Sequence, residues 1–434
     1  MTFAFILRLI LLNQSLWLDE SIEALALQGH FGSLLSYALS DFQPPLYHFI
    51  LRFWTSLVGF SEIALRTPSL LAGLGVVYFA VKIGELIGSR RLGILAGLLV
   101  ATNPLLIYYS QEGRTYAMTT FFVTASFYYL LQLLHRNNPK SYIFYSIFTI
   151  LYLWTSYLSW FVLLSQVIYV LWQKRYNLLI PQLFSALTLI FWIPSLLSSL
   201  AIGMGDVTNI PGWGRVVGGI SLKSLALTWV KMNIGRISFE NNYLYVVITS
   251  ILAFLHIYIL RKTRLSILVL WFLVPITLSS FISLWVPVYS YTRVLFVVPS
   301  YLLILSLGLS RLPRFYSSMV LLLNMIFICI FWFSPRFHRE DWRSLTQYLN
   351  SQTGTIVLPS LKQNAPFLYY DLNLLLSSST DPSLSSSKVY YVKYVEDAFD
   401  PEHLGPANLS QLGYTLTNQR TYPGLQLDIY ENSH

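Results

Sequence analysis

Long apolar runs separated by short polar connections occupy the first three quarters of the chain. Runs of this length predict membrane-spanning α-helices, about eleven in all. They fall near residues 1–14, 63–87, 92–109, 116–134, 142–156, 159–172, 178–200, 243–260, 266–286, 294–310 and 316–333. The runs at 142–156 and 159–172 are short and nearly adjoin, so the count could differ by two there. The first run is also short, and we expect it to be the C-terminal part of a span whose start this sequence gives incompletely.

The basic residues between the runs predict the orientation of the spans. Pairs or triplets lie in every second connection and mark the cytoplasmic side by the positive-inside rule. They are Arg90 and Arg91, Arg136 and Lys140, Lys174 and Arg175, Arg261 with Lys262 and Arg264, and Arg311 with Arg314. Of the nine Asp and Glu residues before position 335, only Glu85 falls on that side. We therefore expect a multi-pass plasma-membrane protein with its chemistry on the non-cytoplasmic face, because carboxylates near lipid are costly unless they serve a site.

Two segments on the predicted outer face are long enough to build a site, residues 13–62 and residues 201–242. In the first, Ser21 to Gln28 and Leu46 to Leu57 are apolar enough to form amphipathic helices along the membrane interface. The second is rich in Gly and Trp, and we predict an ordered loop there.

After Pro335 the composition changes, and ten of the nineteen acids lie in the last hundred residues. Asp341 to Asn350 is predicted to be helical, Thr355 to Leu358 and Lys388 to Val395 to be strands, and Tyr414 to Tyr430 to form a hairpin. The expected organisation is a mainly α transmembrane bundle over 1–334, followed by a small extracytoplasmic α/β domain over 335–434.

Composition agrees with a membrane protein, since 55% of the 434 residues are hydrophobic, 11% are charged and the mean hydropathy is +0.56. The net charge of +9 comes from basic residues spaced singly or in pairs between apolar runs, which argues against nucleic-acid binding. The single cysteine, Cys329, allows no intramolecular disulfide and no multi-cysteine metal site. No P-loop, Rossmann glycine signature, nucleophile elbow or HExxH-type pair occurs.

The first group with candidate chemistry is Asp19 with Glu20, where the first span meets the outer segment. Adjacent carboxylates there need cations, a metal or hydrogen bonds, because like charges raise each other's pKa. We assign Asp19 as a general base for an acceptor hydroxyl and Glu20 as a positioning or charge-balancing group. The alternative is that Asp19 only caps a helix beginning near Ser21.

The second group surrounds two prolines. Pro44 and Pro45 predict a helix start at Leu46 and leave the preceding polar residues at a rigid corner. The candidate substrate-binding residues here are Asp41, Gln43, Tyr47 and His48. The alternatives are a turn capped by Asp41 and a buried, hydrogen-bonded His48.

The third and fourth groups place arginines at span ends. Arg114, in the turn after the third run, is a candidate phosphate ligand, because a guanidinium binds phosphate in a bidentate manner. Gln111, Glu112 and Tyr116 accompany it, and a structural pair between Glu112 and Arg114 is the alternative. Tyr291 and Arg293 precede the tenth run, where Arg293 either binds phosphate or extends to the interface as arginines at helix ends commonly do.

These stretches resemble, in this order, the family 39 glycosyltransferases, which include protein O-mannosyltransferase-like and 4-amino-arabinose-transferase-like membrane enzymes. The similar segments run from residue 15 to about 349: SLWLDE, DFQPPLYHFILRFW, SEIALRTPSLLAGL, NPLLIYYSQEGRTYAM, YSYTRVLFVVPSYLLI and EDWRSLTQYL. Many members carry a histidine or a charged residue before the two prolines, where this chain has Gln43.

The resemblance implies a GT-C fold and transfer of a hexose or pentose from a polyprenyl phosphate, with inversion, to a lipid, glycan or protein acceptor. It gives Asp19 the role of base and Arg114 that of donor-phosphate ligand. No metal is assigned, and for a divalent metal the candidate ligands are Asp41 and Glu112.

Two other functional classes fit many spans with charged residues. A lipid or sugar transporter or flippase would place charges at midplane depth in helices broken by Gly or Pro, whereas the candidates here lie at span ends. A large, arginine-rich outer loop late in the chain would favour an O-antigen ligase or polymerase. In this chain the outer segment with the candidate residues comes first. A sensor is disfavoured, because a single membrane anchor would suffice for it.

Overall fold

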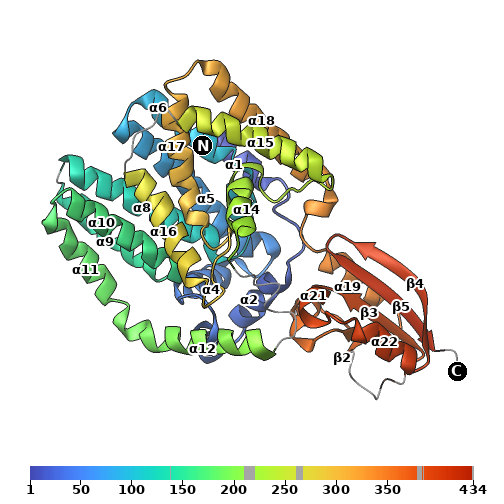
Figure 1. The fold of residues 1–434 in the computed structure, drawn as a ribbon. Coiled ribbons are helices and arrows are strands. Elements are labelled where there is room, and N and C mark those ends of the chain that lie inside the picture. The colour runs from blue at the N-terminus through green and yellow to red at the C-terminus, as the bar shows by residue number, and fades with distance from the viewer. Residues whose placement is uncertain (137, 210–219, 261–266, 379–383, 385, 433–434) are drawn as a thin grey trace.

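Helices form most of the structure, and one β-sheet follows them near the C-terminus (Figure 1). The computed structural model describes residues 1–136, 138–209, 220–260, 267–378, 384 and 386–432. The mainly helical fold class is therefore confirmed. The basic cluster at 261–264 and most of the Gly- and Trp-rich stretch at 210–219 lie outside the described residues.

Five described helical segments are long and apolar enough to cross a membrane. They are α5 (Glu62–Ile87), α8 (Thr115–Arg136), the segment Tyr176–Ala201, which contains α11 (Leu179–Leu187) and the start of α12 (Ile193–Asn209), α15 (Asn242–Leu260) and α18 (Arg314–Phe333). A sixth candidate is the pair α6 (Arg90–Ala101) and α7 (Pro104–Ser110), bent by 62°. The described residues thus contain several candidate spans, and the total of about eleven stays a prediction.

Shorter helices complete the bundle. Three shorter apolar segments are Tyr157–Trp172 (η1, Tyr157–Ser159, with α10, Trp160–Trp172), Ile267–Ile282 (α16) and Leu295–Leu309 (η4, Leu295–Val297, with α17, Val298–Leu309). Two more helices, α1 (Thr2–Leu9) and α9 (Pro139–Leu153), correspond to predicted runs. At the centre, α5 contacts α1, α4, α6, α7, α8 and α17, which makes it the common wall of the bundle.

The break between α6 and α7 follows from two consecutive residues, Asn103 and Pro104. Asn103 accepts a hydrogen bond from the Leu106 backbone N–H at 3.0 Å, and Pro104 occupies the first helical turn. Proline cannot continue α6 but suits the start of a new helix, so α7 leaves at an angle. The turn 111–114, which carries Arg114, comes directly after α7.

The first outer segment folds into three helices, α2 (Leu18–Gln28), α3 (Phe31–Ser40) and α4 (Leu46–Val58). The start of α4 directly after Pro44 and Pro45 confirms the prediction for that corner. The second outer segment differs from the predicted loop, because α14 (Leu222–Ile234) occupies much of it. Ser221 and Ser224 cap that helix reciprocally through side chain and backbone, so it has a local start signal.

The C-terminal sheet has five strands in the order β2-β1-β3-β5-β4. The strands are β1 (Thr355–Leu358), β2 (Leu375–Ser378), β3 (Lys388–Lys393), β4 (Tyr414–Tyr422) and β5 (Leu425–Asn432). The first three pair in parallel, and β5 pairs antiparallel with both β3 and β4. Among the described residues, four α-helices accompany the sheet, α19 (Trp342–Asn350), α20 (Ala365–Tyr369), α21 (Glu396–Phe399) and α22 (Leu404–Gln411), together with the 3-10 helix η6 (Leu361–Gln363). Strands were predicted for β1, β3 and the β4–β5 hairpin, and not for β2.

Polar contacts attach this C-terminal region to the helical bundle. Tyr370 accepts a hydrogen bond from the Leu16 backbone N–H at 2.8 Å, directly before α2. Arg343 forms an ion pair with Glu62 of α5 at 2.6 Å. Leu18, the first residue of α2, packs against the apolar cluster under the sheet. The region therefore lies against the segment that carries Asp19, as Figure 1 also shows for α2.

Candidate functional site

Arg114 lies beside two carboxylates of helix α2. Its Nη2 atom is 3.6 Å from Oδ2 of Asp19, and its Nη1 atom is 3.8 Å from Oε2 of Glu23. Residues four apart on a helix project from the same face, so both carboxylates point toward the turn that carries Arg114. The side chains of Asp19 and Arg114 thus meet at one place in the fold.

The hydrogen-bonding capacity of Arg114 is largely unused. Both carboxylate contacts exceed ordinary hydrogen-bond length, and its Nε atom has no partner among the described residues. The side chain is only 14% exposed, so water cannot readily serve all five N–H donors. A buried guanidinium in this state is suited to receive an anion.

Three other buried arginines provide the contrast. Arg8 donates to three backbone carbonyls and to a serine hydroxyl. Arg66 binds three carbonyls as well as Glu20. Arg339 binds two carbonyls and forms an ion pair with Glu112 at 2.8 Å. These three are saturated by the protein itself, which identifies them as structural.

Glu20 faces away from Asp19 into the bundle and is 1% exposed. It accepts hydrogen bonds from Nε of Arg66 at 2.9 Å and from the Gly113 backbone N–H at 2.6 Å. Burial opposes ionisation, but the neighbouring Arg66 guanidinium holds the pKa of Glu20 below its ordinary value. Glu20 therefore fixes the turn before Arg114 relative to α2, a positioning role rather than contact with substrate.

Asp19 is the more accessible carboxylate, with a side chain 38% exposed. It does not cap the helix, because α2 begins at Leu18 with Trp17 at the N-cap position. Its desolvated surroundings raise the pKa of Asp19 above the ordinary value, and Arg114 opposes part of that shift. A higher pKa makes the ionised carboxylate a stronger base.

His48 is buried between two carboxylates. Its Nδ1 atom lies 2.7 Å from Oε1 of Glu23, and its Nε2 atom lies 3.1 Å from Oδ2 of Asp41. Burial alone would lower the pKa of His48, but the two carboxylates raise it to about 9. Tyr37 donates to the second oxygen of Glu23 at 3.2 Å. The imidazolium thus joins the Pro44–Pro45 corner to α2.

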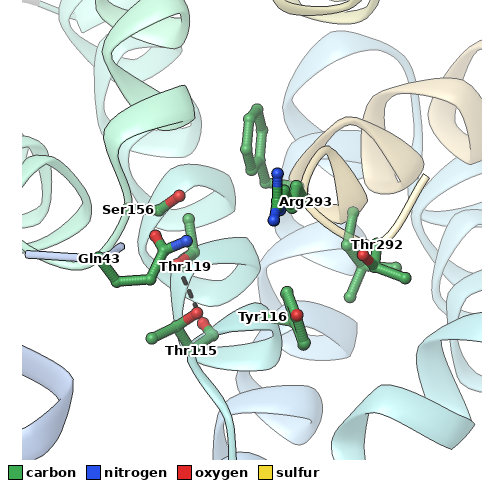
Figure 2. A pocket seen from close by; sticks show the side chains of 9 residues that line it. Gln43, Thr115, Tyr116, Thr119, Ser156, Thr292 and Arg293 are labelled. Atoms are coloured by element: carbon green, nitrogen blue, oxygen red, sulfur yellow. Dashed lines mark hydrogen bonds between the residues drawn. The ribbon is translucent and has the colours of Figure 1, made fainter. Parts of the chain in front are cut away.

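A small cavity, whose lining residues Figure 2 shows, lies next to this charged cluster, since its lining residue Thr115 directly follows Arg114. Gln43 points into it from the proline corner, and its Oε1 atom has no partner among the described residues. Arg293 enters from the segment before η4, where it also donates to the carbonyls of Pro287 and Val288 at 3.1 and 3.2 Å. The other lining residues are Thr115, Tyr116, Thr119, Ser156, Thr292, Leu295 and Phe296. Hydroxyls, an amide and a cation therefore line a cavity that begins one residue after Arg114.

The remaining sequence-predicted residues have structural contacts. Gln111 donates to the Arg8 carbonyl at 3.0 Å, and Glu112 pairs with Arg339 rather than with Arg114. Tyr291 accepts a hydrogen bond from Arg236 at 2.7 Å, and Tyr47 is fully buried against His48.

Sequence reasoning missed Glu23, Arg66 and Arg339. The position of Glu23, one helical turn after Asp19, was a usable signal once α2 was predicted. Nothing local indicates that Arg66 would bind Glu20 or that Arg339 would bind Glu112, because each pair joins distant segments.

The two candidate metal ligands both have cationic partners, His48 for Asp41 and Arg339 for Glu112. Within the described ranges, no three His, Cys, Asp or Glu side chains are grouped as a metal ion would require. The donor set present is thus arranged as ion pairs and does not fit a metal centre.

Comparison with known proteins places this geometry in context. Residues 42–197 match the family described as dolichyl-phosphate-mannose-protein mannosyltransferase. No curated protein matches the chain in sequence. ArnT from Cupriavidus metallidurans in the apo state has a TM-score of 0.60 and 11% identity, with 99% of this chain and 96% of that chain covered.

Two further solved structures are similar. ArnT from the same organism bound to undecaprenyl phosphate gives a TM-score of 0.60 and 10% identity, over 99% of this chain and 96% of that chain. The Archaeoglobus fulgidus oligosaccharyltransferase in complex with Zn and sulfate gives a TM-score of 0.55 and 11% identity, with 99% of this chain and 72% of that chain covered. These likenesses show a shared fold, and together with the family match they confirm the predicted resemblance.

Proposed function

We propose that this chain is a membrane glycosyltransferase that moves a monosaccharide from a polyprenyl phosphate to an acceptor on the non-cytoplasmic face. The observation that carries the proposal is the meeting of Asp19 with an under-bonded Arg114 beside a polar cavity. The match over residues 42–197 and the fold shared with a protein solved with undecaprenyl phosphate support the same donor class.

The reaction we propose is a single displacement at the anomeric carbon. The acceptor oxygen forms the new bond to that carbon, while the bond between carbon and phosphate oxygen breaks and its electron pair leaves with the polyprenyl phosphate. Asp19 takes the acceptor's proton. One displacement inverts the anomeric configuration and needs no covalent enzyme intermediate.

Arg114 stabilises the departing phosphate. Its unused N–H donors supply the hydrogen bonds that the phosphate oxygens require as their negative charge increases. Arg293, whose side chain enters the neighbouring cavity, adds a second positive charge. A positioned base contributes roughly 10²–10⁴-fold, and electrostatic stabilisation of a leaving group is usually the larger effect.

The membrane arrangement is part of the proposal. Residues 1–334 form the catalytic membrane module, and residues 335–434 form a small domain on the outer side of the plasma membrane. The distribution of basic connections supports this orientation, as does the concentration of carboxylates near α2 and the turn 111–114. The contacts of the C-terminal region with Leu16 and Glu62 support a position of the small domain over the segment that carries Asp19.

The experiment measures transfer from a radiolabelled polyprenyl-phosphate sugar by purified, reconstituted protein. Asp19→Asn and Arg114→Ala should each reduce transfer by at least about 10²-fold. The controls Glu240→Gln and Arg136→Ala neutralise an exposed carboxylate and an exposed arginine away from the site, and they should retain wild-type rates. Near-wild-type transfer by both site variants would end the proposal.

The donor sugar can be identified in cells that lack the chain. Mass spectrometry of their polyprenyl-linked sugars should show one species accumulating, and that species names the donor for the purified assay. Absence of any accumulated polyprenyl-linked sugar, together with unchanged surface glycans, would argue against the proposed donor class.

A further inference from the structure

A groove with a mainly apolar lining and three arginines lies between α6, α17 and α18, away from the candidate site. The groove is open on one side and has a volume of about 470 Å³. Three arginines line one part of it, Arg90 and Arg91 at the start of α6 and Arg314 at the start of α18. The other lining residues are Ile94, Leu95, Leu98, Leu309, Ser310, Ser317, Ser318 and Leu321. The groove therefore combines a basic end with an apolar wall.

The position of the groove follows from the direction of its helices. Arg314 begins α18, a helix of 20 residues, whose other end is followed closely by Arg339, the partner of Glu112. A helix of that length extends about 30 Å, the thickness of a bilayer core. The groove thus lies at the opposite ends of these helices from the turn 111–114. Basic residues place these connections on the predicted cytoplasmic side.

The three arginines lack anionic partners in the protein. None of them forms an ion pair with another of the described residues, and all three are exposed. The nearest carboxylate on α5 is Glu85, which approaches α6 beside Gly93 but already pairs with Lys82 at 2.8 Å. Three unpaired guanidinium groups from two separate connections therefore converge on one groove.

We propose that this groove binds the headgroup of an anionic glycerophospholipid from the cytoplasmic leaflet. Guanidinium groups hydrogen-bond phosphodiester oxygens in a bidentate manner, and Ser317 and Ser318 supply additional donors. The leucine and isoleucine side chains, among them Leu98 at 37% exposed, offer an apolar surface along which acyl chains lie. The apolar wall is the reason to assign a lipid rather than a free phosphate.

Basic residues scattered over the cytoplasmic connections would satisfy the positive-inside rule without forming a binding site. Here, by contrast, three arginines line the same groove as a set of apolar side chains. Each arginine near an anionic leaflet contributes about 1 kcal/mol, roughly fivefold in binding, so three together should discriminate strongly by headgroup charge. This lipid would act on the stability or orientation of the bundle and is separate from the donor substrate.

Native mass spectrometry of the purified full chain tests the proposal with phosphatidylglycerol and phosphatidylcholine of identical acyl chains. The wild type should bind phosphatidylglycerol at least about tenfold more strongly than phosphatidylcholine. The triple variant Arg90→Gln, Arg91→Gln, Arg314→Gln should lose that preference, whereas the corresponding triple lysine variant should retain most of it. The control triple Arg136→Gln, Lys140→Gln, Lys174→Gln removes the same charge from other exposed connections and should bind like the wild type.

Several results would overturn the proposal. The first is wild-type phosphatidylglycerol binding by the glutamine triple variant, and the second is an equal loss in the control triple. Competition by glycerol 3-phosphate at the same concentration would show that a free phosphate suffices and would refute the lipid. If the glutamine triple variant does not fold, the single variant Arg314→Gln takes its place, with an expected loss of about fivefold.

Discussion

Oδ2 of Asp19 lies 3.6 Å from Nη2 of Arg114, although one residue belongs to α2 and the other to the turn before α8. The ion pair is long, and the guanidinium has donors to spare. A ligand that offers phosphate oxygens can therefore take over Arg114 and release Asp19 from its charged neighbour. Under the proposed function, the same step would bind the donor phosphate and free Asp19 to act as the base.

Loss of Arg114 should be at least as damaging to transfer as loss of Asp19. Arg114→Ala removes the positive charge facing the leaving phosphate and should lower kcat by about 10²-fold or more. Arg114→Lys keeps the charge without the fork of N–H donors and should give an intermediate rate. Initial rates of transfer at saturating donor, measured for Arg114→Ala, Arg114→Lys and Asp19→Asn, show which variant loses the most activity. A rate for Arg114→Ala well above that of Asp19→Asn would contradict the assigned roles.

The dependence of kcat/KM on pH should show the ionisation of the proposed base, Asp19. Only ionised Asp19 accepts a proton, and its pKa is raised above the ordinary value by desolvation. Activity should therefore fall as the pH drops through a value higher than about 4, the reference for an aspartate. The measurement is kcat/KM against pH for the wild type and for the residual activity of Asp19→Asn. Persistence of the same acidic limb in the variant would assign that limb to another group.

Glu20 should behave as a structural residue, in contrast to Asp19 next to it. Glu20→Gln leaves Arg66 as an uncompensated buried charge, a change that typically costs about 3–5 kcal/mol. Thermal unfolding of the detergent-solubilised protein should show a clearly lower Tm for Glu20→Gln and little change for Asp19→Asn. Equal Tm values for the two variants would show that the buried pair does not stabilise the fold.

His48 should make stability depend on pH. Its pKa is raised in the folded protein to about 9, so protonated His48 stabilises the fold fully below the unfolded value of about 6.5. That contribution, on the order of 3 kcal/mol, is lost as the pH rises through about 9. Tm should fall across this window in the wild type, and the fall should be smaller in His48→Gln. If Tm falls with pH equally in the wild type and in His48→Gln, protonated His48 does not stabilise the fold.

Local patterns in the sequence predicted much of the fold. The helix start after Pro44 and Pro45 was predictable because proline restricts the backbone at the position where α4 begins. The hairpin predicted over Tyr414 to Tyr430 turns at Pro423 and Gly424, and β4 and β5 pair antiparallel on either side of that turn. By contrast, β2 is a short, serine-containing edge strand without alternation, so nothing local predicts it.

The partners of the charged residues could not be read from local patterns. Glu112 and Arg114 are near in sequence and suggest a pair, yet the structure joins Glu112 to Arg339 and places Arg114 beside Glu23. Such pairing depends on how α2, α7 and the C-terminal region pack, which no short pattern encodes. Asp19 and Arg114 are likewise far apart in the sequence, and no local spacing predicts that their side chains meet.

The most direct measurement is the equilibrium binding of polyprenyl phosphate, the proposed leaving group, to purified protein. Charge-assisted hydrogen bonds contribute about 1.5–3 kcal/mol, so Arg114→Ala should raise the Kd by at least about tenfold. Asp19→Asn removes the competing carboxylate at 3.6 Å and should bind as tightly as the wild type or more tightly. A Kd for Arg114→Ala equal to that of the wild type would contradict the account, because the guanidinium would then not bind the donor phosphate.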